Sequence, residues 1–365
     1  MRWDNGRDGQ PILVASRIEI GSWKWKRAAE GGAGYNPSPV PKERTHWMLA
    51  RAAAPKADEH ATPRTTHSLR ACPDAFLLGA VAYDGPFYLP KEAGMASLGA
   101  KLHGKGVDDV FAPIKRILAG TATAPAIAFA AGALSHLAAD TIFHPAVFYF
   151  TGFASHPDSE VSGAYIFRHR AFEAAMDLHL LAEHGAGIER KVKDLFARVS
   201  ASPNAKEVMH AVARFYAEEE HPPSEEEAAR ILRQAGKAQS LFSSAALRVL
   251  ARVLNMRNAS KNSDLSGLFY GRSSQWKSHF TSPRSFRDPI SGTEGIFDVR
   301  EFFQRAVERT LSLFGALERA IAGDANAFPY PGPNLDSGHP VNKEQAMKYC
   351  DPALTKTLVG RGSPH

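Results

Sequence analysis

One apolar stretch, residues 131–145, constrains the fold of this chain more than any other segment. It places His136, Asp140 and His144 four residues apart in a run of Ala, Leu, Ile and Phe. An α-helix turns about 100° per residue, so these side chains fall within roughly 80° of one face. Asp and His are rarely buried unless they are paired or coordinate something. The stretch therefore predicts a metal site on a core helix, or else a buried His–Asp hydrogen bond with an unrelated histidine at the helix end.

Composition narrows the ligands that such a site can use. The chain has 365 residues, of which 44% are hydrophobic and 22% charged, as expected of one or two globular domains with sizeable cores. Its two cysteines, Cys72 and Cys350, are far apart, which excludes a disulfide framework or a cysteine-based zinc site. Any metal must be held by histidine and carboxylate. The net charge of +6 favours an anionic partner, such as a phosphate ester, a peripherally contacted anionic lipid surface or nucleic acid.

The N-terminal sequence and the apolar runs bear on the compartment. The start, Met1 to Gly6, lacks a charged segment followed by an apolar one, so no secretory signal is expected. The longest apolar run, 125–134, is too short for a transmembrane segment and predicts a core helix. We expect a cytoplasmic protein by default, or a secreted one if the true start of the chain differs.

Apolar spacings of three and four predict an all-α protein. Helices are expected at 108–118, 126–143, 160–184 and 241–256, with a short one near 343–349. Thr45 and Ser202 are candidate N-caps, Ser224 opens a capping box, and Asp298 caps the last long helix. The expected organisation is a loosely structured arm at 1–43 with a short strand at 18–25, a metal-binding helical core at 44–200, additional helices at 201–323 with an irregular loop at 257–293, and a Pro/Gly-rich tail at 324–365.

A second pair of metal-ligand side chains has helical spacing. His169 and Glu173 lie four residues apart in the predicted helix 160–184, and Asp177 continues the stripe. Taken alone, such a pair on an amphipathic helix is usually a solvated face. Asp177 would then be either an acceptor that orients an imidazole or an ordinary surface acid.

Three further residues are individually uninformative but complete a set. His46 begins a helix, Asp84 follows a short apolar helix, and His103 lies in a Gly-rich segment. Metal sites in helix bundles are built from side chains on facing helices. Nitrogen and oxygen ligands suit zinc, and manganese or iron would tolerate them. Eight candidate ligands exceed the needs of one tetrahedral ion and predict two or three.

In this order, the set resembles the zinc-dependent phospholipase C family over about residues 44–185. The segments that carry the resemblance are Thr45-His46, residues 76–84 ending in Asp84, residues 98–104 with His103, Ser135-His136 to Asp140 with His144-Pro145, and His169 to Glu173. The resemblance implies a compact multi-helix bundle of the phospholipase C/P1 nuclease type around a trinuclear zinc cluster, with the helices after about residue 200 as a C-terminal helical extension.

The resemblance also implies how the ligands are shared. One zinc would be held by Asp84, His103, His136 and Asp140, and a second by His144, His169 and Glu173. Asp140 would bridge to a third ion shared with His46. In secreted members that third ion is also bound by a processed N-terminal tryptophan. Here 45 residues precede His46, and Trp47 follows it, so this part of the pattern is not matched.

The predicted function is zinc-dependent phosphodiester hydrolysis of the phospholipase C kind, acting on a phospholipid, with Asp84 helping to deprotonate the attacking water. The alternatives are a single-strand nuclease of the S1/P1 type, for which nucleic acid would be the substrate, and a non-catalytic metal-stabilised helical interaction protein. The nucleases are secreted with disulfides, which this sequence lacks, so they rank lower.

Overall fold

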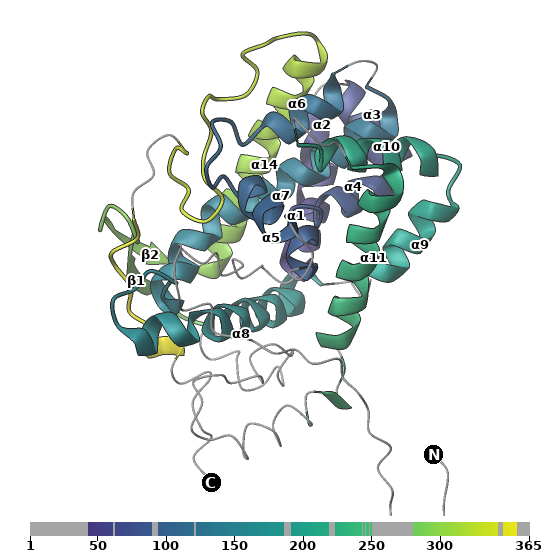
Figure 1. The fold of residues 1–365 in the computed structure, drawn as a ribbon. Coiled ribbons are helices and arrows are strands. Elements are labelled where there is room, and N and C mark those ends of the chain that lie inside the picture. Colours follow the sequence, from purple (N-terminus) through teal and green to yellow (C-terminus); the bar gives the residue numbers. More distant parts are fainter. Residues whose placement is uncertain are drawn as a thin grey trace, which may run out of the picture. The chain divides into compact units, whose positions relative to one another are not determined.

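The computed structural model describes residues 43–60, 63–89, 94–119, 122–185, 191–218, 223–242, 280–341 and 346–355, and a few positions between 244 and 249 (Figure 1). These residues are mainly helical, with one two-stranded hairpin, so the protein is all-α as predicted. The elements are α1 Glu43–Ala53, α2 Ala57–His60, α3 Pro63–Ala71, α4 Pro73–Gly79, α5 Met95–Leu102, α6 Ala112–Leu118, α7 Ala124–Thr151, α8 Ser159–His184, α9 Val192–Ala201, α10 Ala205–Phe215, α11 Glu225–Phe242, β1 Arg284–Arg287, β2 Glu294–Phe297 and α14 Val299–Ile321.

Helix α7 is the element around which the others pack. It contacts α1, α3, α4, α6, α8, α10 and α14, and nearly all its side chains are buried. Pro125 lies in its first turn, where a missing N–H costs nothing, and Gly152 ends it with a φ of +83°. Helix α7 is longer than the predicted helix over 126–143, because it continues past Pro145 to Thr151.

By length and composition, α7 is also the one described helix that could cross a membrane. However, 89% of the most hydrophobic 18-residue segment of α7 is buried inside the protein. Burial on all faces, with His and Asp side chains among the apolar ones, is typical of a core helix.

Helices α4 and α7 approach each other closely because each contributes a glycine to the contact. A Cβ on Gly132 would lie 1.9 Å from the carbonyl oxygen of Phe76, and one on Gly79 would lie 2.0 Å from that of Phe129. No other residue fits at either position without moving a backbone. This contact also fixes where the chain turns after α4.

The C-terminal part of the fold begins with a hairpin that the sequence did not predict. Strands β1 and β2 pair antiparallel, with Arg284 opposite Phe297. Phe297 is buried against Phe302 of α14, with ring centroids 4.9 Å apart. The prediction of an irregular loop over 257–293 is wrong for residues 284–287, which form β1. Each strand has only four residues, and Phe297 is the only buried side chain in either strand, so the sequence shows too little alternation of apolar and polar residues to predict them.

Two of the three predicted caps of the later helices, Asp298 and Ser224, are confirmed. The Asp298 carboxylate accepts from the backbone N–H groups of Arg300 and Glu301, and Ser224 forms the predicted capping box with Glu227. Ser202 is wrong as an N-cap, because it ends α9 and α10 begins only at Ala205. The helix predicted at 108–118 begins at Ala112.

Some predictions fall on other parts of the chain. The arm at 1–43, with its strand at 18–25, lies outside the described residues except for Glu43, as do most of a predicted helix at 241–256 and the start of one at 343–349. Residues 346–350 are described and are not helical.

Candidate metal centre

The structure brings all eight predicted ligands together in the interior. Helix α1 supplies His46, the turn after α4 supplies Asp84, and the end of α5 supplies His103. Helices α7 and α8 supply the rest, and none of the eight is more than 1% exposed. The residues from α7 and α8 are His136, Asp140, His144, His169 and Glu173.

The first group of ligand atoms is built on Asp84 and Asp140. Nε2 of His103 lies 3.5 Å from Oδ1 of Asp84 and 3.6 Å from Oδ2 of Asp140. Nε2 of His136 lies 3.6 Å and 3.0 Å from the same two oxygens. Ligand atoms about 2.05 Å from a tetrahedral zinc are about 3.3 Å apart. The four side chains therefore enclose a space that suits one zinc ion.

The second group is built on Glu173. Its Oε1 lies 2.7 Å from Nε2 of His169 and 3.7 Å from Nε2 of His144. The expectation that His169 and Glu173 form a solvated face is wrong, because both are fully buried where α8 packs on α7 and α1. The alternative of an unrelated histidine at the end of the predicted helix is also wrong, because His144 faces this group.

His46 joins the two groups through the other oxygen of Asp140. Oδ1 of Asp140 lies 3.6 Å from Nε2 of His46 and 3.8 Å from Nε2 of His144. The His46 ring also stacks on that of His136, with centroids 3.8 Å apart. Asp140 thus faces four histidines, two with each oxygen, which is the arrangement required of a carboxylate that bridges ions.

Backbone carbonyls hold three of the imidazoles in one orientation. Nδ1 of His103 lies 2.8 Å from the carbonyl oxygen of Gly99, and Nδ1 of His136 lies 2.9 Å from that of Ala80. Nδ1 of His144 lies 3.0 Å from a carbonyl in the C-terminal segment. A carbonyl only accepts, so each Nδ1 carries a proton and each Nε2 is the ring nitrogen turned toward the cluster. This is the usual outer shell of a metal-binding histidine.

The buried polar atoms of the cluster test whether a metal fits. Each of the eight side chains has at least one buried nitrogen or oxygen without a hydrogen-bond partner, and both oxygens of Asp84, Asp140 and Glu173 are among them. Such atoms are rare in a folded interior because each costs about 1–3 kcal/mol. A cavity of about 10 Å³, large enough for one small ion or water, lies between His46, Asp140 and Glu173. Metal cations bound in this space would give the unpaired nitrogens and oxygens a partner, so the residues present fit a metal site.

Charges within the cluster shift its pKa values strongly. Burial raises the pKa of Asp140, but the surrounding histidines outweigh it and hold that pKa well below the usual value. Burial lowers the pKa of His144, but Asp140 and Glu173 outweigh it and raise that pKa to about 9. For His46, burial dominates and the pKa is well below its usual value. Asp140 and Glu173 are thus kept ionised by the neighbouring histidines, which is the state that binds metal, whereas burial raises the pKa of Asp84.

Helix α1 is fastened to α8 beside the cluster. The Asp177 carboxylate accepts hydrogen bonds from the backbone N–H of Thr45, at 2.9 Å, and from its hydroxyl, at 2.5 Å. Thr45 is therefore not an N-cap, since α1 already begins at Glu43, and Asp177 is buried rather than a surface acid. The next residue is His46, so this bond positions a ligand. Trp47 lies in the core and donates to the carbonyl of Leu77, at 3.0 Å.

We expect Asp177→Asn to lower the free energy of unfolding by about 2 kcal/mol, because hydrogen bonds to a buried charge contribute about 1.5–3 kcal/mol. Denaturant unfolding at constant zinc measures the change. Asp158→Asn is the matched control, since Asp158 is exposed and caps α8, where Asn is an equally good cap. Equal effects of the two substitutions would contradict the role of Asp177.

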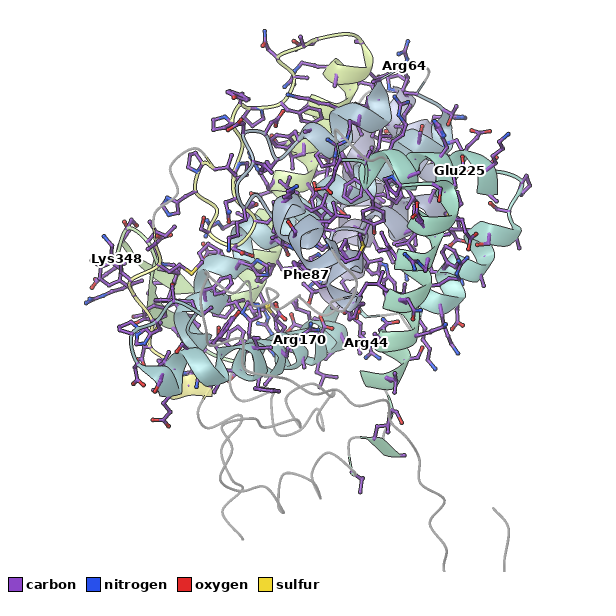
Figure 2. The ribbon with its side chains drawn as sticks, in the orientation of Figure 1. Arg44, Arg64, Phe87, Arg170, Glu225 and Lys348 are labelled. Carbon is purple, nitrogen blue, oxygen red and sulfur yellow. The ribbon has the colours of Figure 1, made fainter. Side chains whose placement is uncertain are left out.

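Two arginines of α8, Arg168 and Arg170, flank the candidate ligand His169 in the sequence. Arg168 is buried, and its guanidinium donates to the carbonyls of Thr151 and Val161. Arg170 belongs to the same helix, α8, and is labelled in Figure 2. Its guanidinium lies over the Tyr88 ring, 5.9 Å from the centroid, and the Tyr88 hydroxyl donates to Oε1 of Glu43, at 2.9 Å. The contacts of Arg170 and Tyr88 thus join α8 to the turn after Asp84 and to α1.

Comparison with known proteins gives one match. A family model described as zinc dependent phospholipase C matches residues 45–221, a segment that contains all eight candidate ligands. The match runs beyond the resemblance predicted to residue 185 and includes α9 and α10. No curated protein and no solved structure matches the chain. Residues 45–221, just under half of the chain, thus match the zinc-dependent phospholipase C family.

Proposed function

We propose that the protein is a zinc-dependent phosphodiester hydrolase that cleaves the glycerol–phosphate bond of a phospholipid. The observation that carries the proposal is the buried cluster of eight nitrogen and oxygen donors, most of them without other partners, in a segment that matches this family. Asp84, His103, His136 and Asp140 would hold one zinc, His144, His169 and Glu173 a second, and His46 with Asp140 a third. Bound zinc would supply positive charge to the phosphate and lower the pKa of a water molecule.

Asp84 would transfer a proton in the proposed reaction. Oδ1 of Asp84 faces His103 and His136, and its Oδ2 has no hydrogen-bond partner. Oδ2 can therefore take the proton of the attacking water as the new oxygen–phosphorus bond forms. The same proton is then available to the glycerol oxygen as its bond to phosphorus breaks. The products are diacylglycerol and a phosphorylated headgroup.

The direct test is hydrolysis by zinc-loaded protein. We expect diacylglycerol to be released from phosphatidylcholine vesicles, and expect His169→Ala to abolish the release. His210→Ala is the control, because that histidine is 62% exposed and lies on α10 away from the cluster. Cleavage of single-stranded DNA without lipid hydrolysis would favour the nuclease alternative. Bound zinc with neither activity would favour a metal-stabilised interaction protein.

Removal of zinc should destabilise the protein. Without a cation, the donors of the cluster stay buried and unsatisfied, and a ligand at 1,000 times its dissociation constant adds about 4 kcal/mol to stability. We expect a chelator to lower the melting temperature and added zinc to restore it, as measured by calorimetry. Equal melting temperatures with and without zinc would contradict the proposed site.

A further inference from the structure

A loop near the C-terminus lies against the cluster. It comprises residues 334–338 and is outside the segment that matches the family. The carbonyl of Leu335 is the acceptor 3.0 Å from Nδ1 of His144, and the N–H of Leu335 donates to the carbonyl of His103, also at 3.0 Å. One residue of this loop thus contacts two candidate ligands from different helices.

Pro145 explains why the loop lies at this place. Pro145 has no N–H, so the carbonyl of Thr141, four residues earlier in α7, loses its helical partner. Gly338 packs against that carbonyl, and a Cβ there would lie 2.8 Å from the Thr141 oxygen. Its φ of +71° is a second reason for glycine. The loop therefore sits on the interruption in α7 that directly follows His144.

The loop is held in shape by its own hydrogen bonds. Oδ1 of Asn334 accepts from the N–H of Asp336, at 2.9 Å, and of Ser337, at 3.2 Å. The carbonyl of Asn334 accepts from the N–H of Gly338, at 2.8 Å. His339 follows and pairs with Asp288, at 3.0 Å. These bonds fix the backbone of the loop, including that of Asp336.

The Asp336 carboxylate lies beside the His144 imidazole. Its Oδ1 lies 3.7 Å from Nδ1 of His144, and its side chain is 23% exposed. Nδ1 of His144 carries the proton that the Leu335 carbonyl accepts, so Asp336 lies behind this ring, on the side away from the other ligands.

We propose that Asp336, together with the carbonyl of Leu335, is the positioning group of His144, and that this C-terminal loop is an integral part of the zinc site. A carboxylate beside Nδ1–H orients the ring and makes Nε2 a better donor to a cation. Asp336 itself does not face the ligand side and is not a catalytic residue. The inference rests on the proposed zinc site, and it assigns a function to a segment that the family match does not cover.

The test compares the full-length wild type with Asp336→Asn, Gly338→Ala and Ser337→Ala, each titrated with zinc against a competing chelator. Asp336→Asn keeps the shape of the side chain and removes its charge, so we expect zinc affinity to fall about 10- to 100-fold. Gly338→Ala pushes the loop off α7 and should weaken binding at least as much. Ser337→Ala changes the same loop without touching His144 and should bind as the wild type does.

Recovery with excess zinc separates positioning from a merely structural role. In Asp336→Asn we expect kcat to return to within about tenfold of wild type as zinc is raised, with KM unchanged, because the lost group acts through the metal. Wild-type affinity in Asp336→Asn would overturn this inference and leave the proposed function standing. The inference would also fail if zinc affinity were unchanged while the metal-free protein melted at a lower temperature. A wild type that binds no zinc would overturn both proposals.

Discussion

Replacing Asp140 with asparagine should remove more than one of the proposed zinc ions from each chain and lower the proposed phosphodiesterase activity by at least about 10³-fold, equivalent to about 4 kcal/mol. Asp140 faces His136 and His103 with one oxygen, and His46 and His144 with the other. Asparagine keeps the shape but has one oxygen and no charge, so it cannot serve both sides. Metal analysis of the purified variant, together with initial rates at saturating substrate, measures the two effects.

Glu173→Gln provides the comparison for Asp140. Glu173 lies near only His144 and His169 among the candidate ligands, so its loss should affect one ion rather than several. His210→Ala should leave zinc content unchanged. A full zinc complement in Asp140→Asn, or equal losses in Asp140→Asn and Glu173→Gln, would contradict the bridging role of Asp140.

Placing a methyl group on Gly132 should cost about 3 kcal/mol of folding stability and also weaken zinc binding. The new Cβ would lie 1.9 Å from the carbonyl oxygen of Phe76, a contact that only separation of α4 from α7 can relieve. That separation would move Ala80, whose carbonyl lies 2.9 Å from Nδ1 of His136. Denaturant unfolding of Gly132→Ala, with and without zinc, measures both consequences.

Gly163→Ala is the matched control on α8. Gly163 is exposed, and a Cβ there would meet nothing within 4 Å. Alanine in an exposed helical position should stabilise the protein by about 0.5–1 kcal/mol. If Gly132→Ala and Gly163→Ala changed stability in the same direction, the close approach of α4 and α7 would not be the reason for glycine at position 132.

The sequence by itself determined the relations between residues on one helix. A rise and turn that are the same for every α-helix place His136, Asp140 and His144 on one face of α7, and His169 and Glu173 on one face of α8. Helix caps such as Asp298 depend on backbone groups two or three residues away, so they too could be predicted. The family resemblance added Asp84, His103 and His46, whose individual sequence contexts are uninformative.

Only the tertiary structure decided which faces are buried and what supports the ligands. His169 and Glu173 would suit a solvated helix equally well, and they are interior because α8 packs against α7 and α1. The carbonyls behind the imidazoles, and Asp336 almost two hundred residues after His144, have no sequence signal. Such contacts depend on the packing of many side chains from distant segments, whereas spacing along a helix depends on the geometry of the backbone alone.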